Sequence, residues 1–217
     1  MTTPDTPLRA DARRNRDQIL VAAREIFAER GADVAMEEIA RRASVGVGTL
    51  YRRFADRETL IRAVFRETFQ VVADEIHAAL TEEPTGWGAL TRVMRQSAWL
   101  HVSVQAKSST VTAVVKADPE TSRLRDYLLD MLSEVVRRAQ EEGTLRRDVA
   151  VGDLAILFMS VVNQAPTLTP EAAGLAPGRV LAIMMDGLRA SVPGDLPGRP
   201  LTRADLDFDA SRCVEGR

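Results

Sequence analysis

Residues 44–54 read SVGVGTLYRRF, a stretch that combines two glycines with a tyrosine and two adjacent arginines. It permits three interpretations: a phosphate-binding loop, an arginine-rich turn exposed to solvent, or part of a helix–turn–helix. The sequence argues against the phosphate-binding loop, because a dinucleotide-binding motif needs a preceding strand and a third glycine. The Gly-Lys-Ser/Thr of a P-loop is also missing from the chain.

A helix–turn–helix fits the spacing best. We predict a short helix over 36–42, a tight turn over 43–45 and a second short helix that starts near Gly46. Leu50 and Phe54 are spaced i and i+4, so both fall on one helical face and anchor the second helix to a core. On spacing alone, an arginine-rich turn between core helices remains the alternative.

The opposite face of this second helix has the chemistry of a DNA contact. Val47 and Gly48 are small enough for the backbone to approach base edges in a major groove. Thr49, Tyr51 and the arginines after it can donate to phosphates, which fixes register without reading sequence. The predicted DNA-binding residues are Arg14, Met36, Glu37, Val47, Gly48, Thr49, Tyr51, Arg52, Arg53 and Arg57.

Charge is distributed unevenly along the chain. The net charge is −2, yet residues 41–57 hold five arginines against one acid, Asp56. Residues 9–16 hold four arginines against Asp11. Because electrostatic attraction acts locally, basic patches on an acidic protein still form usable anion-binding surfaces.

The whole chain predicts an all-α fold of about nine helices with no strand and no internal repeat. The domains expected are a flexible N-terminal arm (1–12), a helix–turn–helix domain (13–58), a larger helical domain (59–192) and a disordered tail (193–217). The segment 151–165 is apolar nearly all round, so it must be covered on both sides, often by a second subunit. The expected helices span about 15–30, 36–42, 46–54, 56–80, 89–105, 107–117, 118–143, 151–165 and 175–190.

Composition argues against catalysis and metal binding. The chain has two histidines, far apart, and one cysteine, Cys213, in the polar tail. Nucleophilic or metal chemistry therefore has few candidate groups, and we expect no enzyme activity, cofactor or metal. The N-terminus has no apolar signal region, and the longest apolar run, 154–162, is too short for a bilayer. We expect a soluble, cytoplasmic protein.

The first quarter of the chain resembles the DNA-binding domain of TetR-family transcriptional regulators. The matching positions lie between Arg16 and Phe65: Ile19, Leu20, Ala23, Phe27, Gly31, Ile39, Ala40, Ala43, Val45, Gly48, Thr49, Leu50, Tyr51, Phe54, Arg57, Glu58 and Leu60. The resemblance implies that the first three helices and the start of the fourth bind DNA. The remaining helices would then form a domain that senses a small molecule.

The resemblance also implies a homodimer through the last two helices. A two-fold dimer requires a palindromic DNA operator. Interface candidates are Leu154, Phe158, Val161, Val162, Val180, Ile183, Met184 and Leu188. Effector-pocket candidates are Phe65, Phe69, Met94, Trp99, His101, Gln105, Tyr127, Met131 and Phe158. Large apolar residues at helical spacing favour an ordinary core over a pocket, whereas His101 and Gln105 are the polar groups best placed to hold a ligand.

We therefore expect a ligand-responsive repressor; the alternative is a helical small-molecule carrier or interaction module without specific DNA binding. Two departures from the family pattern are visible. Ala35 stands where a capping Thr or Ser is usual, which removes a cap worth about 1 kcal/mol. Ser44 stands where the turn usually has Gly, so it must adopt a left-handed conformation at some strain if the turn keeps the family geometry.

Overall fold

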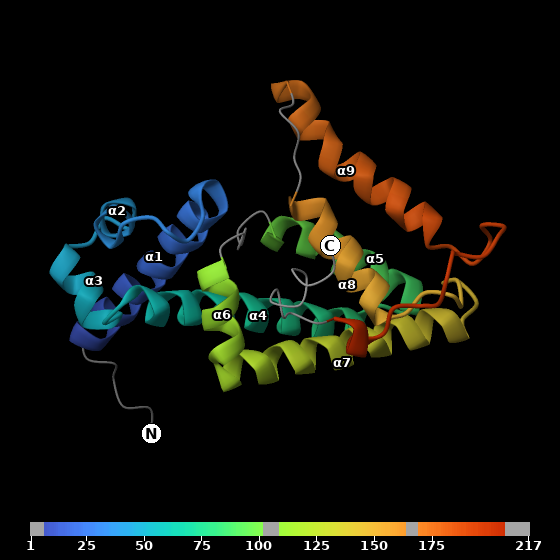
Figure 1. The fold of residues 1–217 in the computed structure, drawn as a ribbon, viewed down its shortest axis with the longest axis horizontal. Coiled ribbons are helices and arrows are strands. Elements are labelled where there is room, and N and C mark those ends of the chain that lie inside the picture. The colour runs from blue at the N-terminus through green and yellow to red at the C-terminus, as the bar shows by residue number, and fades with distance from the viewer. Residues whose placement is uncertain (1–6, 102–108, 164–168, 207–217) are drawn as a thin grey trace, which may run out of the picture. The chain divides into compact units, whose positions relative to one another are not determined.

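The computed structural model describes residues 7–101, 109–163 and 169–206, and the elements in them are helical apart from one isolated bridge, Leu145–Arg189 (Figure 1). This confirms the all-α fold. In chain order the elements are α1 (Pro7–Arg30), α2 (Met36–Arg42), α3 (Val47–Arg53), α4 (Arg57–Glu82), α5 (Gly86–His101), α6 (Ser109–Ala117), α7 (Pro119–Glu141), α8 (Val151–Asn163), α9 (Pro170–Gly187) and the 3-10 turn η1 (Arg203–Asp205). No helix in these ranges is both long and apolar enough to cross a bilayer.

The chain divides into two compact units. The first unit comprises Met1–Glu67 and Ser103–Thr121, and the second comprises Thr68–Val102 and Ser122–Arg217. The boundary therefore falls inside α4, later than the expected boundary at residue 58. Helix α6, expected in the larger domain, belongs to the first unit.

Helix α1 begins earlier than the sequence predicted. We expected a flexible arm over residues 1–12, but the helix already starts at Pro7. Proline is well tolerated in the first turn of a helix, because the N–H it lacks has no intrahelical partner there. Residues 1–6 lie outside the described part of the chain. Among the α1 residues whose side chains are described, the buried positions run from Ile19 through Leu20, Ala23 and Phe27.

An ionic corner joins α4 to the α6–α7 junction within the first unit. Asp118 is only 7% exposed and accepts hydrogen bonds from Arg66 on α4, with Nε at 2.8 Å and Nη2 at 2.5 Å. The same carboxylate caps α7 by accepting the N–H of Thr121 at 3.0 Å. This confirms the helix start predicted at residues 118–120. It also explains why the junction groups with the first unit.

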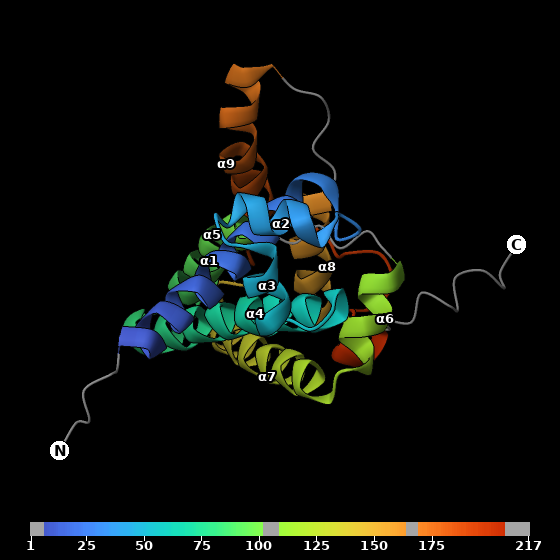
Figure 2. The ribbon, with the colours of Figure 1, turned by 90° about the vertical axis from the view of Figure 1, so that its left-hand side faces the viewer.

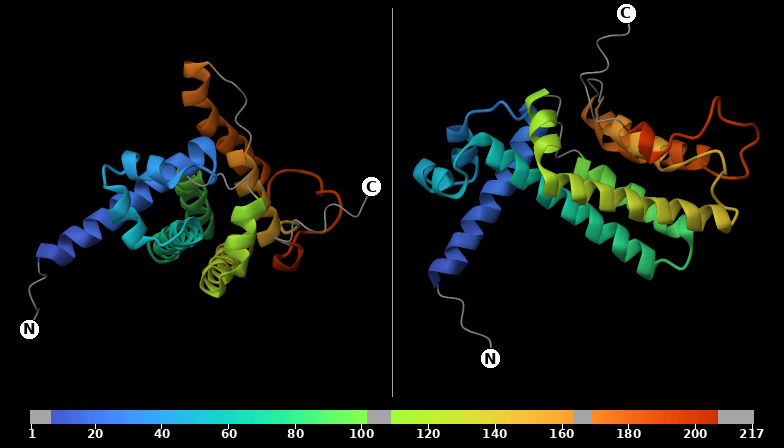
Figure 3. Two further views of the ribbon diagram at one scale, coloured as in Figure 1. Left: turned by 60° about the vertical axis from the view of Figure 1, so that its left-hand side comes forward. Right: turned by 60° about the horizontal axis from the view of Figure 1, so that its bottom comes forward.

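The second unit has its own core, built from α4, α5, α7, α8 and α9 (Figure 3). Helix α5 approaches α7 so closely that a Cβ on Gly86 would lie 2.4 Å from the backbone nitrogen of Ala139. Helix α7 ends at Glu141, the chain then turns at Gly143, whose φ of 68° suits glycine, and Leu145 just beyond it is fully buried. The helix end predicted at Gly143 is thus confirmed.

The chain after α9 is held against α7 and α8, contrary to the disordered tail expected from residue 193. The Gly152 N–H donates to the Leu201 carbonyl at 2.8 Å, and a Cβ on Gly152 would lie 2.4 Å from that oxygen. Arg203 pairs with Asp126 at 3.1 Å and Asp130 at 2.5 Å on α7. Long-range hydrogen bonds therefore order residues 193–206 despite their Pro/Gly-rich composition. Residues 207–217 lie outside the described part.

We predict that Asp118→Asn, which removes the charge but keeps a side chain able to cap a helix, destabilises the protein in a pH-dependent way. Hydrogen bonds from Arg66 and Thr121 hold the pKa of the Asp118 carboxyl well below its usual range. The stabilisation is therefore complete above the unfolded pKa of about 3.9 and disappears as the pH falls below it. Because Arg66 is partly exposed, we expect a loss of about 2 kcal/mol in unfolding free energy at neutral pH.

Denaturant unfolding of both proteins at neutral and at acidic pH measures this difference. The difference in unfolding free energy between the wild type and Asp118→Asn should shrink as the solution is acidified. Asp74→Asn, at an exposed site on α4, is the control, and its difference from the wild type should not shrink in this way. A difference that is the same at both pH values would contradict the ionic role of Asp118.

Candidate nucleic-acid interface

Helices α2 and α3 are joined by a tight turn whose hydrogen bonds explain its shape. The Ser44 N–H donates to Arg41 O at 3.1 Å, and the Val45 N–H donates to Ala40 O at 3.0 Å. This pair of bonds closes the end of α2 as a Schellman motif, which places the residue after the C-cap in the left-handed region. Ser44 occupies that position with φ of 55°, the one non-glycine residue with positive φ in the described chain. The left-handed conformation predicted for Ser44 is confirmed.

Helix α3 is held to the first unit by the two predicted anchors. Leu50 has no exposed surface, and Phe54, the C-cap, is 4% exposed. The Phe54 N–H donates to Leu50 O at 2.8 Å, which closes the helix at its last turn. These two contacts fix which face of α3 points outward.

The outward face of α3 is small at its start and basic at its end. Val47 is 39% exposed and Tyr51 is 43% exposed, and Arg52 and Arg53 are also exposed. A Cβ on Gly48 would meet no atom within 4 Å, so the fold leaves open space there. In Figure 2, which faces this side of the first unit, α3 lies below α2 and in front of the start of α4.

Two hydrogen bonds orient polar side chains on this face. The Tyr51 hydroxyl donates to Glu37 Oε1 at 3.4 Å, which links α3 to the first turn of α2. Arg52 Nη2 donates to Thr49 Oγ1 at 3.0 Å, one turn back along α3. Among the described residues, no side chain forms an ion pair or a hydrogen bond with the Arg53 guanidinium. The tyrosine is therefore pre-oriented, whereas Arg53 extends from the helix end.

Three predicted DNA-binding residues have different surroundings from those expected. Met36 is 5% exposed and belongs to the core, so it offers no surface to DNA. Arg57 is half-buried, and its Nη1 donates to Ala32 O at 3.1 Å, which ties the start of α4 to the loop after α1. Arg14 is exposed and forms an ion pair with Asp11 one turn away.

Not every arginine near the turn contributes free positive charge. Arg42 pairs with Glu29 at 2.8 Å and Glu25 at 3.5 Å on α1, and hydrogen bonding from Arg42 lowers the pKa of Glu29. Arg41 is exposed, and no such partner is found for it in the described ranges. The positive charge around the turn between α2 and α3 therefore comes from Arg41, Arg52 and Arg53 more than from Arg42.

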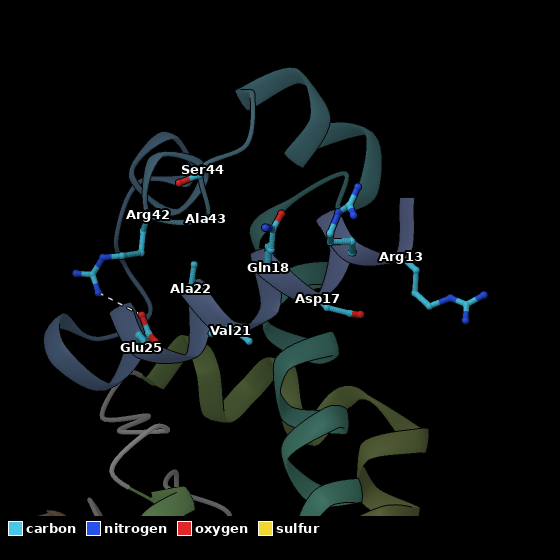
Figure 4. A pocket seen from close by; sticks show the side chains of 10 residues that line it. Arg13, Asp17, Gln18, Val21, Ala22, Glu25, Arg42, Ala43 and Ser44 are labelled. Carbon is cyan, nitrogen blue, oxygen red and sulfur yellow. Dashed lines mark hydrogen bonds and ion pairs between the residues drawn. The ribbon is translucent and has the colours of Figure 1, made fainter. Parts of the chain in front are cut away.

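An open groove of about 730 Å³ lies between α1 and the end of α2. Figure 4 shows Arg42, Ala43 and Ser44 on one side of it, with Gln18 and Ala22 on the other. The lining also includes Arg13 and Arg14, from the part of α1 that precedes the core. The sequence prediction singled out only Arg14 from this stretch, although residues 9–16 already stood out as basic.

The helix starts of this region differ in how they are capped. Ala35, before α2, and Gly46, before α3, provide no side-chain hydrogen bond to the helix that follows. The missing cap predicted at Ala35 is thus confirmed. Asp56, before α4, accepts the Thr59 N–H at 2.7 Å, and this bond lowers the pKa of the Asp56 carboxyl. The cap predicted at Asp56 is therefore present.

The effector-pocket candidates are only partly brought together. Met94 and Met131 are buried in one core cluster of the second unit, whereas Tyr127 is 50% exposed on α7. Phe69 is half-buried, and Phe65 is buried in the part of α4 that belongs to the first unit. The side chains of Trp99, His101 and Phe158, and the whole of Gln105, lie outside the described part of the structure.

The dimer candidates divide between core and surface. Leu154 is fully buried and Leu188 is 4% exposed, so both are reassigned to the core of the subunit. On α9, Val180 is 41% exposed and Ile183 is 68% exposed, while Met184 is half-buried. The side chains of Val161 and Val162, like that of Phe158, fall outside the described residues. Among the dimer candidates with described side chains, the exposed apolar ones therefore lie on α9.

Comparison with known proteins covers both halves of the chain. The family model described as bacterial regulatory proteins, tetR family, matches residues 19–64. A second model, described as the C-terminal domain of SbtR-like transcriptional regulators, matches residues 88–190. A helix–turn–helix-type transcriptional regulator of Staphylococcus aureus is 28% identical over 139 residues, which are 58% of this chain and 72% of that protein.

Solved structures agree with these matches. A TetR transcriptional regulator of Streptomyces coelicolor is 30% identical, with a TM-score of 0.61, over 82% of this chain and 99% of that chain. A TetR regulator from Mycobacterium vanbaalenii is 31% identical, with a TM-score of 0.58, over 84% of this chain and 99% of that chain. These similar proteins are described as transcriptional regulators.

We predict that Ser44→Gly raises the unfolding free energy by about 1 kcal/mol, because glycine adopts positive φ without the steric cost that other residues bear. Thermal or denaturant unfolding measures the change. Ser44→Ala is the matched control, since it removes the hydroxyl but keeps a Cβ, and it should not stabilise the protein. Equal stability of the two variants would mean that the backbone strain at Ser44 is negligible.

Proposed function

The chain belongs to the TetR family of bacterial regulatory proteins, and on that premise we propose that it is a ligand-responsive transcriptional repressor. It binds a palindromic operator as a homodimer in the cytoplasm, and a small-molecule effector releases it. The observation that carries the proposal is the outward face of α3. The burial of Leu50 and Phe54 fixes the orientation of α3. Its small residues, a tyrosine hydrogen-bonded to Glu37 and two arginines therefore lie together on one exposed surface.

The residues of this face divide into two roles. Val47 and Gly48 let the backbone of α3 enter a major groove and approach base edges, so they select sequence. Tyr51 and the arginines donate to phosphates, so they supply affinity and register. Glu37 is an acceptor, and we propose that it positions the Tyr51 hydroxyl without contacting phosphate.

Release by an effector follows from linkage. A small molecule lowers operator affinity only if it binds the operator-free conformation more tightly than the operator-bound one. We propose that the effector binds in the second unit, as the match to a regulator C-terminal domain supports. The exposed apolar residues of α9 support a dimer through this helix, and α8 is expected to join it.

A helical carrier without specific DNA binding is the competing function. Salt dependence separates the two, because a protein that neutralises several phosphates loses affinity steeply between low and moderate salt. Capture of genomic DNA fragments by the purified protein, followed by sequencing, tests the regulator function directly. Enrichment of a palindromic sequence supports it, whereas no enrichment over random fragments refutes it.

We predict that Tyr51→Ala and Arg53→Ala each weaken DNA binding by roughly 10-fold on every sequence, since each removes a phosphate donor. Changes at Val47 or Gly48 should instead alter which sequence is preferred. Gly48→Ala is informative because its Cβ meets open space, so the fold should tolerate it and only the approach to DNA changes. Gel shifts that show unchanged binding for all four variants would remove α3 from the interface.

We predict that Ile183→Glu converts the dimer to a monomer, because it places a charge in the apolar surface of α9. Ile183 is 68% exposed within the subunit, so the substitution should leave the fold intact. Val71→Glu, at a site on α4 that is 39% exposed, is the control for an added surface charge. Analytical ultracentrifugation measures both, and a dimer that survives Ile183→Glu would exclude α9 from the interface.

A further inference from the structure

Helix α9 is attached to the second unit through its C-terminal part. Met185 is 8% exposed and Leu188, the C-cap, is 4% exposed, and both belong to the core cluster of this unit. Between residues 171 and 180, none of the described side chains is buried. Figures 1 and 2 show the N-terminal end of α9 standing clear of α5, α7 and α8. The direction in which α9 extends is therefore set at its C-terminal end.

A buried arginine from the loop after α7 binds this end of α9. Arg146 is 9% exposed, and its backbone N–H donates to Leu188 O at 3.1 Å. Its Nη1 donates to Gly187 O, at the end of α9, at 3.4 Å, and its Nη2 donates to Gly194 O, in the chain after α9, at 2.8 Å. A positive charge is favourable here, because the last carbonyls of a helix lack intrahelical partners and form the negative end of its dipole. Arg146 thus holds both the end of α9 and the chain that leaves it.

The guanidinium of Arg146 is itself held by Asp148, two residues further along the loop. Arg146 Nε donates to Asp148 Oδ1 at 2.5 Å and Nη2 donates to Oδ2 at 2.7 Å, a bidentate pairing that fixes the plane of the guanidinium. These bonds hold the pKa of the Asp148 carboxyl well below its usual range. The side chain of Gln140 donates to Arg146 O at 3.0 Å and to Val149 O at 2.8 Å, so the backbone of the loop is fixed as well. We refer to Arg146 and Asp148 as the α9 clamp.

The chemistry of the α9 clamp suits orientation better than stabilisation. Taking two charges out of water costs free energy that their attraction roughly offsets, so a buried ion pair often contributes no more stability than apolar side chains do. Apolar contacts have no direction, however, whereas the planar guanidinium binds one carboxylate and two carbonyls along fixed directions. Lysine carries the same charge but cannot reproduce this geometry. The clamp therefore restricts the angle between α9 and the loop that joins α7 to α8.

We propose that Arg146 is a positioning residue: it sets the angle of α9 and, through the dimer formed by α9, the spacing between the two operator half-sites. The inference rests on the proposed function and adds the residue that tunes it. With 18 residues, α9 is about 27 Å long, so a tilt of about 10° at its C-terminal end displaces the other end by about 5 Å. That displacement exceeds the rise of one base pair, about 3.4 Å. A change at the clamp is therefore large enough to alter the preferred spacing by one base pair.

The test compares Arg146→Lys with Arg138→Lys, because both keep the charge and lose the directional bonds of a guanidinium in the second unit. Arg138 is the matched control, since it binds the end of another helix. Its Nη1 donates to Leu80 O at 2.8 Å and its Nη2 donates to Glu83 O at 3.2 Å, in the last turn of α4 and just after it. A general loss of stability should be common to both variants, whereas a changed angle of α9 should be confined to Arg146→Lys.

A second clamp variant guards against misfolding of the first. Arg146→Met/Asp148→Asn removes both charges of the clamp, so neither is left buried without its partner. Thermal unfolding and analytical ultracentrifugation establish which variants fold and dimerise. A folded clamp variant that no longer dimerises supports the inference, provided that Arg138→Lys remains a dimer.

DNA binding is measured on the operator found by genomic capture and on two derivatives whose central spacer is one base pair shorter or longer. We expect the wild type and Arg138→Lys to bind the natural spacing at least ~10-fold more tightly than either derivative, because a changed spacing strains a symmetric complex. Each clamp variant should bind one of the derivatives as tightly as the natural operator, or more tightly. A folding defect lowers the fraction of active protein equally for all three duplexes, so it does not imitate this result.

Two results would overturn the inference while leaving the proposed function standing. One is a wild type that binds all three spacings equally. The other is a clamp variant that folds, dimerises and retains the wild-type preference for one spacing. A wild type that is monomeric, or that enriches no operator, would instead refute the proposed function, so the two failures are distinguishable.

Discussion

The burial of Leu50 and Phe54 is the packing interaction on which the interface depends. Helix α3 has seven residues, too few to be stable as an isolated helix in water. Its orientation therefore comes from these two side chains, which lie four residues apart and both face the core. Without them, the small and basic residues of the opposite face would have no fixed geometry. With them, the tyrosine and the arginines become a surface of defined shape.

Local sequence does little to stabilise this module. Neither α2 nor α3 has a side-chain cap, because Ala35 and Gly46 occupy the cap positions, and Ser44 adopts a left-handed conformation. Ala35 in place of a capping residue and the left-handed Ser44 in place of glycine each cost on the order of 1 kcal/mol of folding free energy. Gly46 in place of a capping residue costs only a few tenths of a kcal/mol. Packing against α1 must offset them. The module is thus held by tertiary contacts, and its stability is tied to that of the whole first unit.

Periodicity, caps and glycines predicted most of the fold, since these signals lie within a few residues of the structure they specify. The strain at Ser44 and the missing cap at Ala35 were both predictable on that basis. The start of α9 was not predicted, although Thr169, Pro170 and Glu171 carry the same cap, proline and acid as residues 118–120. Burial of Met36 and the order in residues 193–206 depend on partners distant in sequence. No local pattern reveals such partners.

The close approach of Gly152 and Leu201 also sets an order of events during synthesis. The partner of Gly152 is translated about fifty residues later, which takes roughly 3 to 10 s at bacterial elongation rates. The first unit, by contrast, ends at Thr121 and has its complete sequence well before that. On the ribosome, the DNA-contacting half of the protein is therefore able to fold while the face of α8 around Gly152 is still uncovered. The sequence of the first unit is thus complete on the nascent chain before the segment that closes the second unit has been made.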